Sequence, residues 1–231
     1  MRHSDIDLVR ELPLFREMAP AHRETLMRAA LLQKFPGHVT LIQEGENSDF
    51  LHVLVDGAVE LFATWEGRET TLDILRPVTT FILAAVVRDE VHLMSARTLT
   101  ASRILMIPAE TVREIFGRDA SFARAVVDEL AERFRGMVRI LKDHKLRTGT
   151  ERLANWILQE DCRQGSSGRV LLAHDKRTLS SRLGMTPENL SRNLASLSAY
   201  GVTGGGREIV ISDRDALERR ARPDPLIDGL T

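Results

Sequence analysis

Three polar residues near the C-terminal end of this 231-residue chain are spaced to share one face of a helix: Glu188, Ser191 and Arg192. Arg192 can donate two parallel hydrogen bonds to guanine O6 and N7, Glu188 can accept one from a cytosine amino group, and Ser191 can contact a base edge or a methyl group. Taken singly, Glu188 has an alternative explanation as a helix-dipole cap, and Arg192 has one as a solvated surface arginine. The surrounding segments decide between these alternatives.

The segment from Asp175 onward has the signals of two short helices joined by a tight turn. Gly184 ends the first predicted helix, because glycine adopts a left-handed conformation at low cost. Thr186 is a good N-cap and Pro187 suits the first position of the second helix. The buried face of that helix is predicted at Leu190, Leu194 and Leu197. This arrangement, followed by a turn at 201–206, a strand at 207–211 and a helix at 213–220, indicates a winged helix-turn-helix.

The charge distribution fits a polyanionic partner at this end of the chain. Residues 145–222 hold 14 Lys and Arg against 9 Asp and Glu, whereas the whole chain has a net charge of -1. A basic third beside an acidic remainder suits contact with DNA through one end only. An uneven surface charge without any partner is the alternative.

The N-terminal half alternates short apolar segments with turns, which is typical of an antiparallel sandwich or small barrel. Strands are predicted at residues 39–42, 51–55, 58–62, 71–75 and 96–107. Asp56-Gly57 predicts a tight hairpin, because both central positions of a type I′ turn need positive φ. Residues 5–32, including Ile6 and Leu8, predict two short helices interrupted at Pro13 and Pro20.

A long helix with one apolar stripe is predicted between the two halves. The stripe residues include those expected to join two copies: Val126, Val127, Leu130, Phe134, Val138 and Leu141. Packing of the stripe on its own domain and pairing with a second copy are both open. Residues 144–148 form the predicted hinge before the next helix, 148–161.

The chain resembles the cyclic-AMP receptor protein / fumarate-nitrate reduction regulator (Crp/Fnr) family of bacterial transcription factors, and more closely regulators of the ferrous-iron-transport type. The resemblance lies in Leu12-Pro13-Leu14-Phe15, the Gly45…Asp49-Phe50-Leu51…Asp56-Gly57 pattern, the long helix and Glu188-x-x-Ser191-Arg192. It implies an α+β fold with a β-roll (jelly-roll) sensor domain at 1–118, a dimerisation helix at 119–145 and a winged helix-turn-helix at 146–231.

The resemblance also implies how the chain acts. A homodimer would bind a palindromic operator with TTGAT-like half-sites in double-stranded DNA, respond to a small effector and contact RNA polymerase. The residues implied to contact the bases are Glu188, Ser191 and Arg192. Backbone contacts, which position without specifying, fall to Lys176, Arg177, Arg182, Thr186 and Asn193.

The sensor region departs from its relatives. Cyclic-nucleotide-binding members hold the ribose and phosphate with a Gly-Glu pair and an Arg-Ser-Ala motif, but this chain has Leu83-Ala84 and Met94-Ser95-Ala96. A cyclic phosphate would lose its ion pair, so we expect an effector other than cyclic AMP. The single cysteine, Cys162, excludes the four-cysteine iron–sulfur mechanism.

The expected effector pocket contains an apolar segment and its neighbours: Phe81, Leu83, Ala84, His92, Met94 and Ser95. Three alternatives stay open: an ordinary core, a site for haem or another hydrophobic effector with His92, Met94 or His52 as ligands, and a small-metal site using His92, His52 or His3. Cys162, beside Arg163, is either a redox switch or inert.

Two other functional classes fit less well. A metal-dependent cupin-like enzyme needs a His-rich ligand set, whereas His38, His52 and His92 are widely spaced. A pure interaction protein would not need the complete polar triplet. We therefore expect no enzyme activity. The chain also has no apolar run long enough to span a bilayer and its N-terminus does not resemble a signal peptide, so we expect a cytoplasmic protein.

Overall fold

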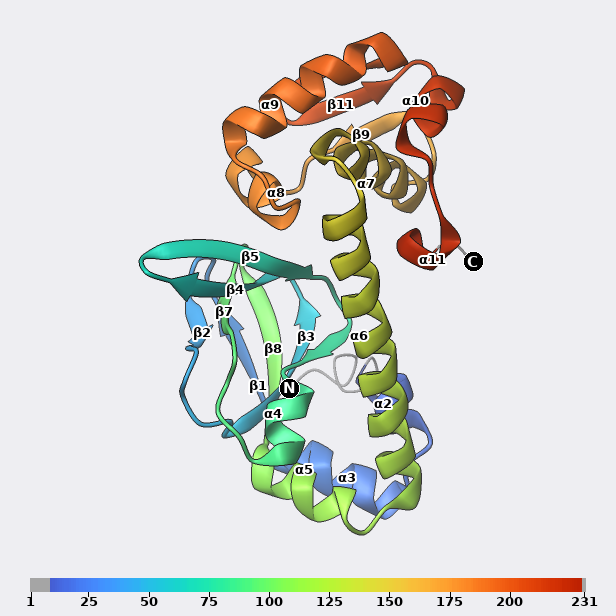
Figure 1. Cartoon of the computed structure of the whole chain (residues 1–231). Coiled ribbons are helices and arrows are strands. Elements are labelled where there is room, and N and C mark those ends of the chain that lie inside the picture. The colour runs from blue at the N-terminus through green and yellow to red at the C-terminus, as the bar shows by residue number, and fades with distance from the viewer. Residues whose placement is uncertain (1–8, 230–231) are drawn as a thin grey trace. The chain divides into compact units, whose positions relative to one another are not determined.

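The computed structural model describes residues 9–229, which fall into two compact units that meet between Arg133 and Phe134 (Figure 1). The division lies inside one continuous helix, α6 (Ala120–Leu146). His3, Ile6 and Leu8, which the sequence assigned to a metal site or a first helix, lie outside the described residues.

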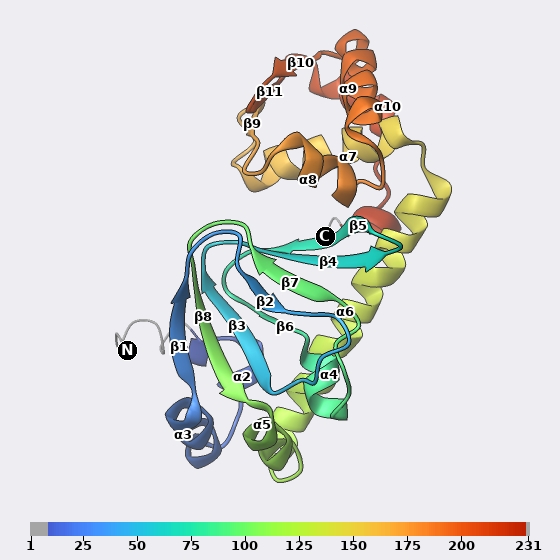
Figure 2. The ribbon, with the colours of Figure 1, turned by 90° about the vertical axis from the view of Figure 1, so that its left-hand side faces the viewer.

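Unit 1 is built on two four-stranded antiparallel sheets, visible side by side in Figure 2. One sheet has the order β1 (Leu31–Phe35), β8 (Ser102–Pro108), β3 (Phe50–Asp56), β6 (Thr79–Phe81). The other has the order β2 (Thr40–Ile42), β7 (Ser95–Thr98), β4 (Val59–Trp65), β5 (Arg68–Leu75). The predicted α+β class with an antiparallel sensor domain is confirmed.

Strand alternation divides the core of unit 1 into two clusters, because successive side chains point to opposite faces. Leu51, Val53 and Val55 of β3 pack in a cluster with residues of the surrounding helices. Leu54 of the same strand packs in the second cluster, with residues of both sheets. The helices of this unit include, besides α6, α2 (Pro13–Arg16), α3 (Pro20–Ala29), α4 (Leu83–Arg88) and α5 (Ala109–Phe116).

Two local expectations are corrected. Strands β3 and β4 belong to different sheets, so Asp56-Gly57 forms a link between sheets and not a hairpin. Only Gly57 has positive φ there, and a Cβ on it would lie 2.7 Å from the Ala101 carbonyl oxygen. The turn with two positive-φ residues is Glu66-Gly67, between β4 and β5, where φ is 47° and 74°. Pro13 and Pro20 begin helices α2 and α3, because a missing N–H costs nothing at the first helical position.

The apolar stripe of α6 is buried in one part and exposed in another. Phe122 and Val126 are buried in the core of unit 1, so the prediction that Val126 contacts a second copy is wrong. Leu130 is partly buried. The exposed apolar residues are Val127, which precedes Leu130, and four residues that follow it: Phe134, Met137, Val138 and Leu141.

Unit 2 packs helices against a small antiparallel sheet of order β10 (Val202–Gly205), β11 (Glu208–Ile211), β9 (Arg169–Leu171). Its helices after α6 are α7 (Gly149–Arg163), α8 (Lys176–Arg182), α9 (Pro187–Ser196), the 3₁₀ turn η1 (Leu197–Tyr200), α10 (Arg214–Ala221) and α11 (Pro225–Asp228). Helix α7 begins with a capping box between Thr148 and Glu151. None of the helices in the described part of the chain is long and apolar enough to cross a membrane.

Candidate nucleic-acid interface and sensor core

Helices α8 and α9 meet at the turn that the sequence predicted. Gly184 has φ +61°, a conformation that favours glycine. Thr186 then caps α9, its hydroxyl accepting a hydrogen bond from the Asn189 N–H at 3.2 Å, and Pro187 occupies the first helical position. Local chemistry therefore fixes where the second helix of the pair begins.

One face of helix α9 packs on the core of unit 2, and the opposite face is exposed to solvent. Leu190 and Leu197 are buried in the core of unit 2, and Leu194 packs against it. Glu188, Ser191 and Arg192 are all exposed on the opposite side. The structure thus places the three predicted base-reading side chains together on the exposed face of a helix whose opposite face is packed in the core of unit 2.

Local contacts order this polar face. The pKa of Glu188 is lowered by a hydrogen bond at its own backbone, by the Thr186 hydroxyl and by the positive charge of Arg192, so it stays ionised. The Ser191 hydroxyl donates to the Pro187 carbonyl oxygen at 3.0 Å. The Arg192 guanidinium donates to the Asn189 side-chain oxygen, a contact that a base edge can replace.

The predicted backbone contacts are distributed unevenly. Arg177 and Thr186 are exposed, and Lys176 and Arg182 are half-buried, around the start of α8 and the turn. Asn193 is turned inward: its side-chain oxygen accepts from the Thr150 hydroxyl at 2.9 Å and its amide nitrogen lies 3.6 Å from the Met185 sulfur. This placement goes against the predicted phosphate contact of Asn193.

The wing carries a cation to which the sequence analysis gave no role. Strands β10 and β11 form an antiparallel pair, and Arg207 lies exposed in the turn between them. The signal available in the sequence was a lone arginine directly after three glycines, Gly204-Gly205-Gly206.

Comparisons with known proteins match both units. The cyclic nucleotide-binding domain family matches residues 32–119, and the Crp-like helix-turn-helix domain family matches residues 151–220. A Mycobacterium tuberculosis protein, the CRP-like cAMP-activated global transcriptional regulator, is 26% identical over 215 residues, covering 90% of this chain and 96% of that protein. The chain belongs to the Crp/Fnr family. It is accordingly a DNA-binding transcription regulator and not an enzyme.

Solved structures share the fold of this chain. A putative cAMP-binding regulatory protein from Silicibacter pomeroyi is 27% identical, with a TM-score of 0.62 over 96% of this chain and all of that one. A putative Crp/Fnr-family regulator from Eubacterium rectale shares the fold, with a TM-score of 0.75 at 21% identity over 92% of this chain and 99% of that one.

The six residues of the expected effector pocket do not gather in one place. Phe81 and Met94 pack in the cluster between the two sheets, whereas Leu83 packs in the cluster with the helices. Ala84 is exposed. The Ser95 hydroxyl accepts a hydrogen bond from the Glu44 N–H at 3.0 Å. The structure therefore does not bring these predicted residues together around one pocket.

The residues from Met94 to Ala96 are among those from which the sequence analysis predicted that no cyclic phosphate binds. Met94, where the resemblance led us to expect a phosphate-binding arginine, is partly buried and packs against the cluster between the two sheets. Arg97 of β7 is paired with Glu60 at 2.7 Å, and Arg88 of α4 is paired with Glu90 at 2.8 Å. An anion placed against Met94 would lose hydration without a compensating charge.

The core of unit 1 contains two buried imidazoles, those of His52 and His92. Nδ1 of His52 and Nδ1 of His92 are both buried without a hydrogen-bond partner, and the His52 ring stacks on Phe81 with 5.2 Å between centroids. Burial, and next the charge of His92, lower the pKa of His52 to about 4. Among residues 9–229, no group of three or more His, Cys, Asp or Glu side chains is placed to hold a metal ion.

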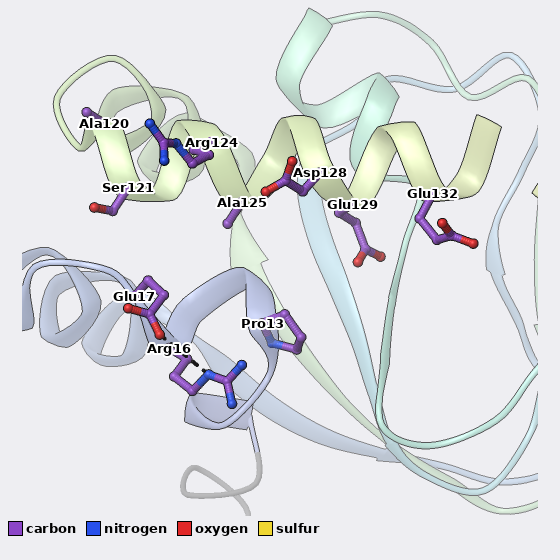
Figure 3. Close-up of a pocket in the computed structure, with 10 residues that line it drawn as sticks. All are labelled: Pro13, Arg16, Glu17, Ala120, Ser121, Arg124, Ala125, Asp128, Glu129 and Glu132. Carbon is purple, nitrogen blue, oxygen red and sulfur yellow. Dashed lines mark ion pairs between the residues drawn. The ribbon is translucent and has the colours of Figure 1, made fainter. Parts of the chain in front are cut away.

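A pocket of about 660 Å³ lies elsewhere in unit 1, between α2 and the first half of α6 (Figure 3). Its lining is charged and predominantly acidic: Pro13, Arg16, Glu17, Ala120, Ser121, Arg124, Ala125, Asp128, Glu129 and Glu132. Arg16 and Glu17 pair with each other at 3.7 Å. The lining includes none of the six predicted effector residues.

Proposed function

We propose that this regulator acts as a homodimer that binds an inverted repeat of TTGAT-like half-sites and responds to an effector other than cyclic AMP. The observation that carries the proposal is the exposure of Glu188, Ser191 and Arg192 on one face of the anchored helix α9. In a helix-turn-helix, residues in the N-terminal half of the second helix contact base edges in the major groove. Arg192 then reads the guanine of the half-site and Glu188 a cytosine of the complementary strand.

The cations around α9 supply the sequence-independent part of binding. Lys176, Arg177 and Arg182 flank the turn, and Arg207 extends from the wing. Phosphate contacts of this kind release counterions, so affinity falls as salt rises. Thr186, exposed at the start of α9, is the further residue that we expect to contact the DNA backbone.

Support for the dimer comes from the exposed face of α6. Val127, Phe134 and Leu141 recur every seven residues, and Met137 lies three residues after Phe134; we call these four residues the α6 seam. All four are large apolar side chains exposed in the single chain. Apolar residues with heptad spacing are buried when two helices pair, and a two-fold interface uses the same patch of both subunits.

The effector proposal rests on the sensor core. Met94 removes the charge that a cyclic phosphate needs, and Phe81, His52 and His92 form an apolar, weakly basic environment. We propose that a largely apolar effector, with haem as one candidate, acts on this part of the sensor.

Selection of binding sites from a random DNA library tests the proposal. We expect the purified protein to enrich an inverted repeat with TTGAT-like half-sites, with half-site centres about 10 bp apart. The Glu188→Ala variant should lose preference for the G·C pair whose cytosine Glu188 contacts. Ser198→Ala, which changes an exposed serine outside α9, should enrich the same sequence as wild type. Enrichment of unrelated sequences or of none would contradict the proposal.

A further inference from the structure

The chain continues past the matched helix-turn-helix domain, which ends at residue 220, with a short helix that folds back on unit 2. Helix α10 ends at Ala221, and Arg222 adopts a left-handed conformation that turns the chain. Asp224 then caps α11, accepting from the Leu226 N–H at 2.7 Å. At the end of α11, Asp228 closes the turn by accepting from the Asp224 N–H at 2.7 Å.

Asp228 is joined to the junction between α6 and α7 by a buried ion pair. Both terminal nitrogens of Arg147 lie 2.7 Å from the two carboxylate oxygens of Asp228. The side chains are only 7% and 3% exposed, respectively. Arg147 also donates to Asp143 at 3.0 Å and to the Arg222 carbonyl oxygen at 3.3 Å, and Gln159 donates to Asp228 at 3.1 Å. A two-pronged, buried arginine–carboxylate pair has a fixed geometry, and removing one partner leaves the other charge uncompensated.

The same junction holds the turn between α8 and α9. Arg152 donates to the Arg147 carbonyl oxygen at 2.8 Å and to the Leu183 carbonyl oxygen at 3.0 Å. The His144 ring lies against Gly184, so that a Cβ on this glycine would be 2.6 Å from His144 Cε1. The predicted hinge at 144–148 is therefore densely bonded, and a contiguous set of contacts runs from the end of α6 to the start of the recognition helix.

We propose that Arg147, Asp228 and Arg152 are positioning residues that hold the recognition helix at a fixed orientation to the end of α6, and thereby select the spacing between the two half-sites of the operator. This inference rests on the proposed function. In a dimer joined through α6, the separation of the two α9 helices depends on the path from α6 through Arg147 and Arg152 to Gly184. Half-site spacing mirrors the separation of the recognition helices.

Operators that differ only in spacer length test this role. Each extra base pair moves the second half-site by about 3.4 Å along the axis and rotates it by about 35°. Kd is measured for wild type, Asp228→Asn and Asp228→Glu on inverted repeats with the optimal spacer and with one base pair more or less. Glu218→Gln is the matched control, because Glu218 makes an exposed ion pair with Arg214 in the same C-terminal region.

We expect Asp228→Asn to reduce the preference for the optimal spacer by about fivefold or more, while discrimination at the guanine of each half-site is kept. Asp228→Glu should restore part of the preference, and Glu218→Gln should match wild type. If Asp228→Asn does not fold, Arg152→Lys takes its place, because an ammonium group cannot bridge both carbonyl oxygens as the guanidinium does. Equal weakening on every spacer would overturn the proposal. A wild-type protein that binds none of the repeats would instead refute the proposed function itself.

Discussion

Replacing Phe134 by alanine tests the α6 seam, because this phenylalanine is its most exposed member. Burying a phenylalanine side chain stabilises by about 1.5–3 kcal/mol. Phe134 is 68% exposed in the single chain, so pairing would add about 1–2 kcal/mol from each copy. The two copies give about 2–4 kcal/mol per dimer, so dimerisation should weaken roughly 30- to 1000-fold.

Sedimentation equilibrium over a range of protein concentrations measures this change. Leu31→Ala is the control, because Leu31 is an exposed apolar residue of β1 with a comparable exposed fraction, 51%. It should leave the dimer constant unchanged. Far-ultraviolet circular dichroism should confirm that Phe134→Ala still folds, since the residue is not part of a buried cluster. A Phe134→Ala protein that dimerises as tightly as wild type would refute the assignment of the seam.

Three further predictions follow from single contacts. Gly184→Ala should destabilise the protein by about 1–3 kcal/mol in urea unfolding, more than Gly165→Ala, because both glycines have positive φ but only Gly184 packs against the His144 ring. The folded-state pKa of His52 is lowered to about 4, so the unfolded state binds more protons below pH 6.5. Stability should therefore fall from pH 6.5 toward pH 4 by up to about 3 kcal/mol, and His52→Gln should flatten this slope; an unchanged slope would contradict the assignment. Cyclic AMP should leave operator affinity unchanged in a fluorescence anisotropy titration, and a shift of Kd would show that a phosphate site exists despite Met94.

Local chemistry explains which features the sequence predicted well. Gly184, Thr186 and Pro187 act within a few residues of their own positions, so the turn and the start of α9 follow directly from residue types. The exposed triplet follows in turn from helical spacing once the buried face at Leu190 is recognised.

Features set by tertiary contacts were beyond sequence reasoning. Asp56-Gly57 has the composition of a hairpin, but β3 pairs with β8 and β6 and leaves β4 to the other sheet. The stripe of α6 looks uniform, yet Val126 lies in the core whereas its neighbour Val127 is exposed. The pairing of Arg147 with Asp228 joins residues 81 positions apart, and no local pattern marks either one.

The central claim is that Arg192 reads a guanine in each half-site. Its most direct test is a cycle of four affinities: wild type and Arg192→Ala, each on the inverted repeat and on a repeat in which that guanine is replaced. We predict that Arg192→Ala weakens binding to the intact repeat by about 1–3 kcal/mol per contact and has little further effect once the guanine is gone. Equal loss on both DNAs would show that Arg192 contacts the backbone alone, and would contradict the account.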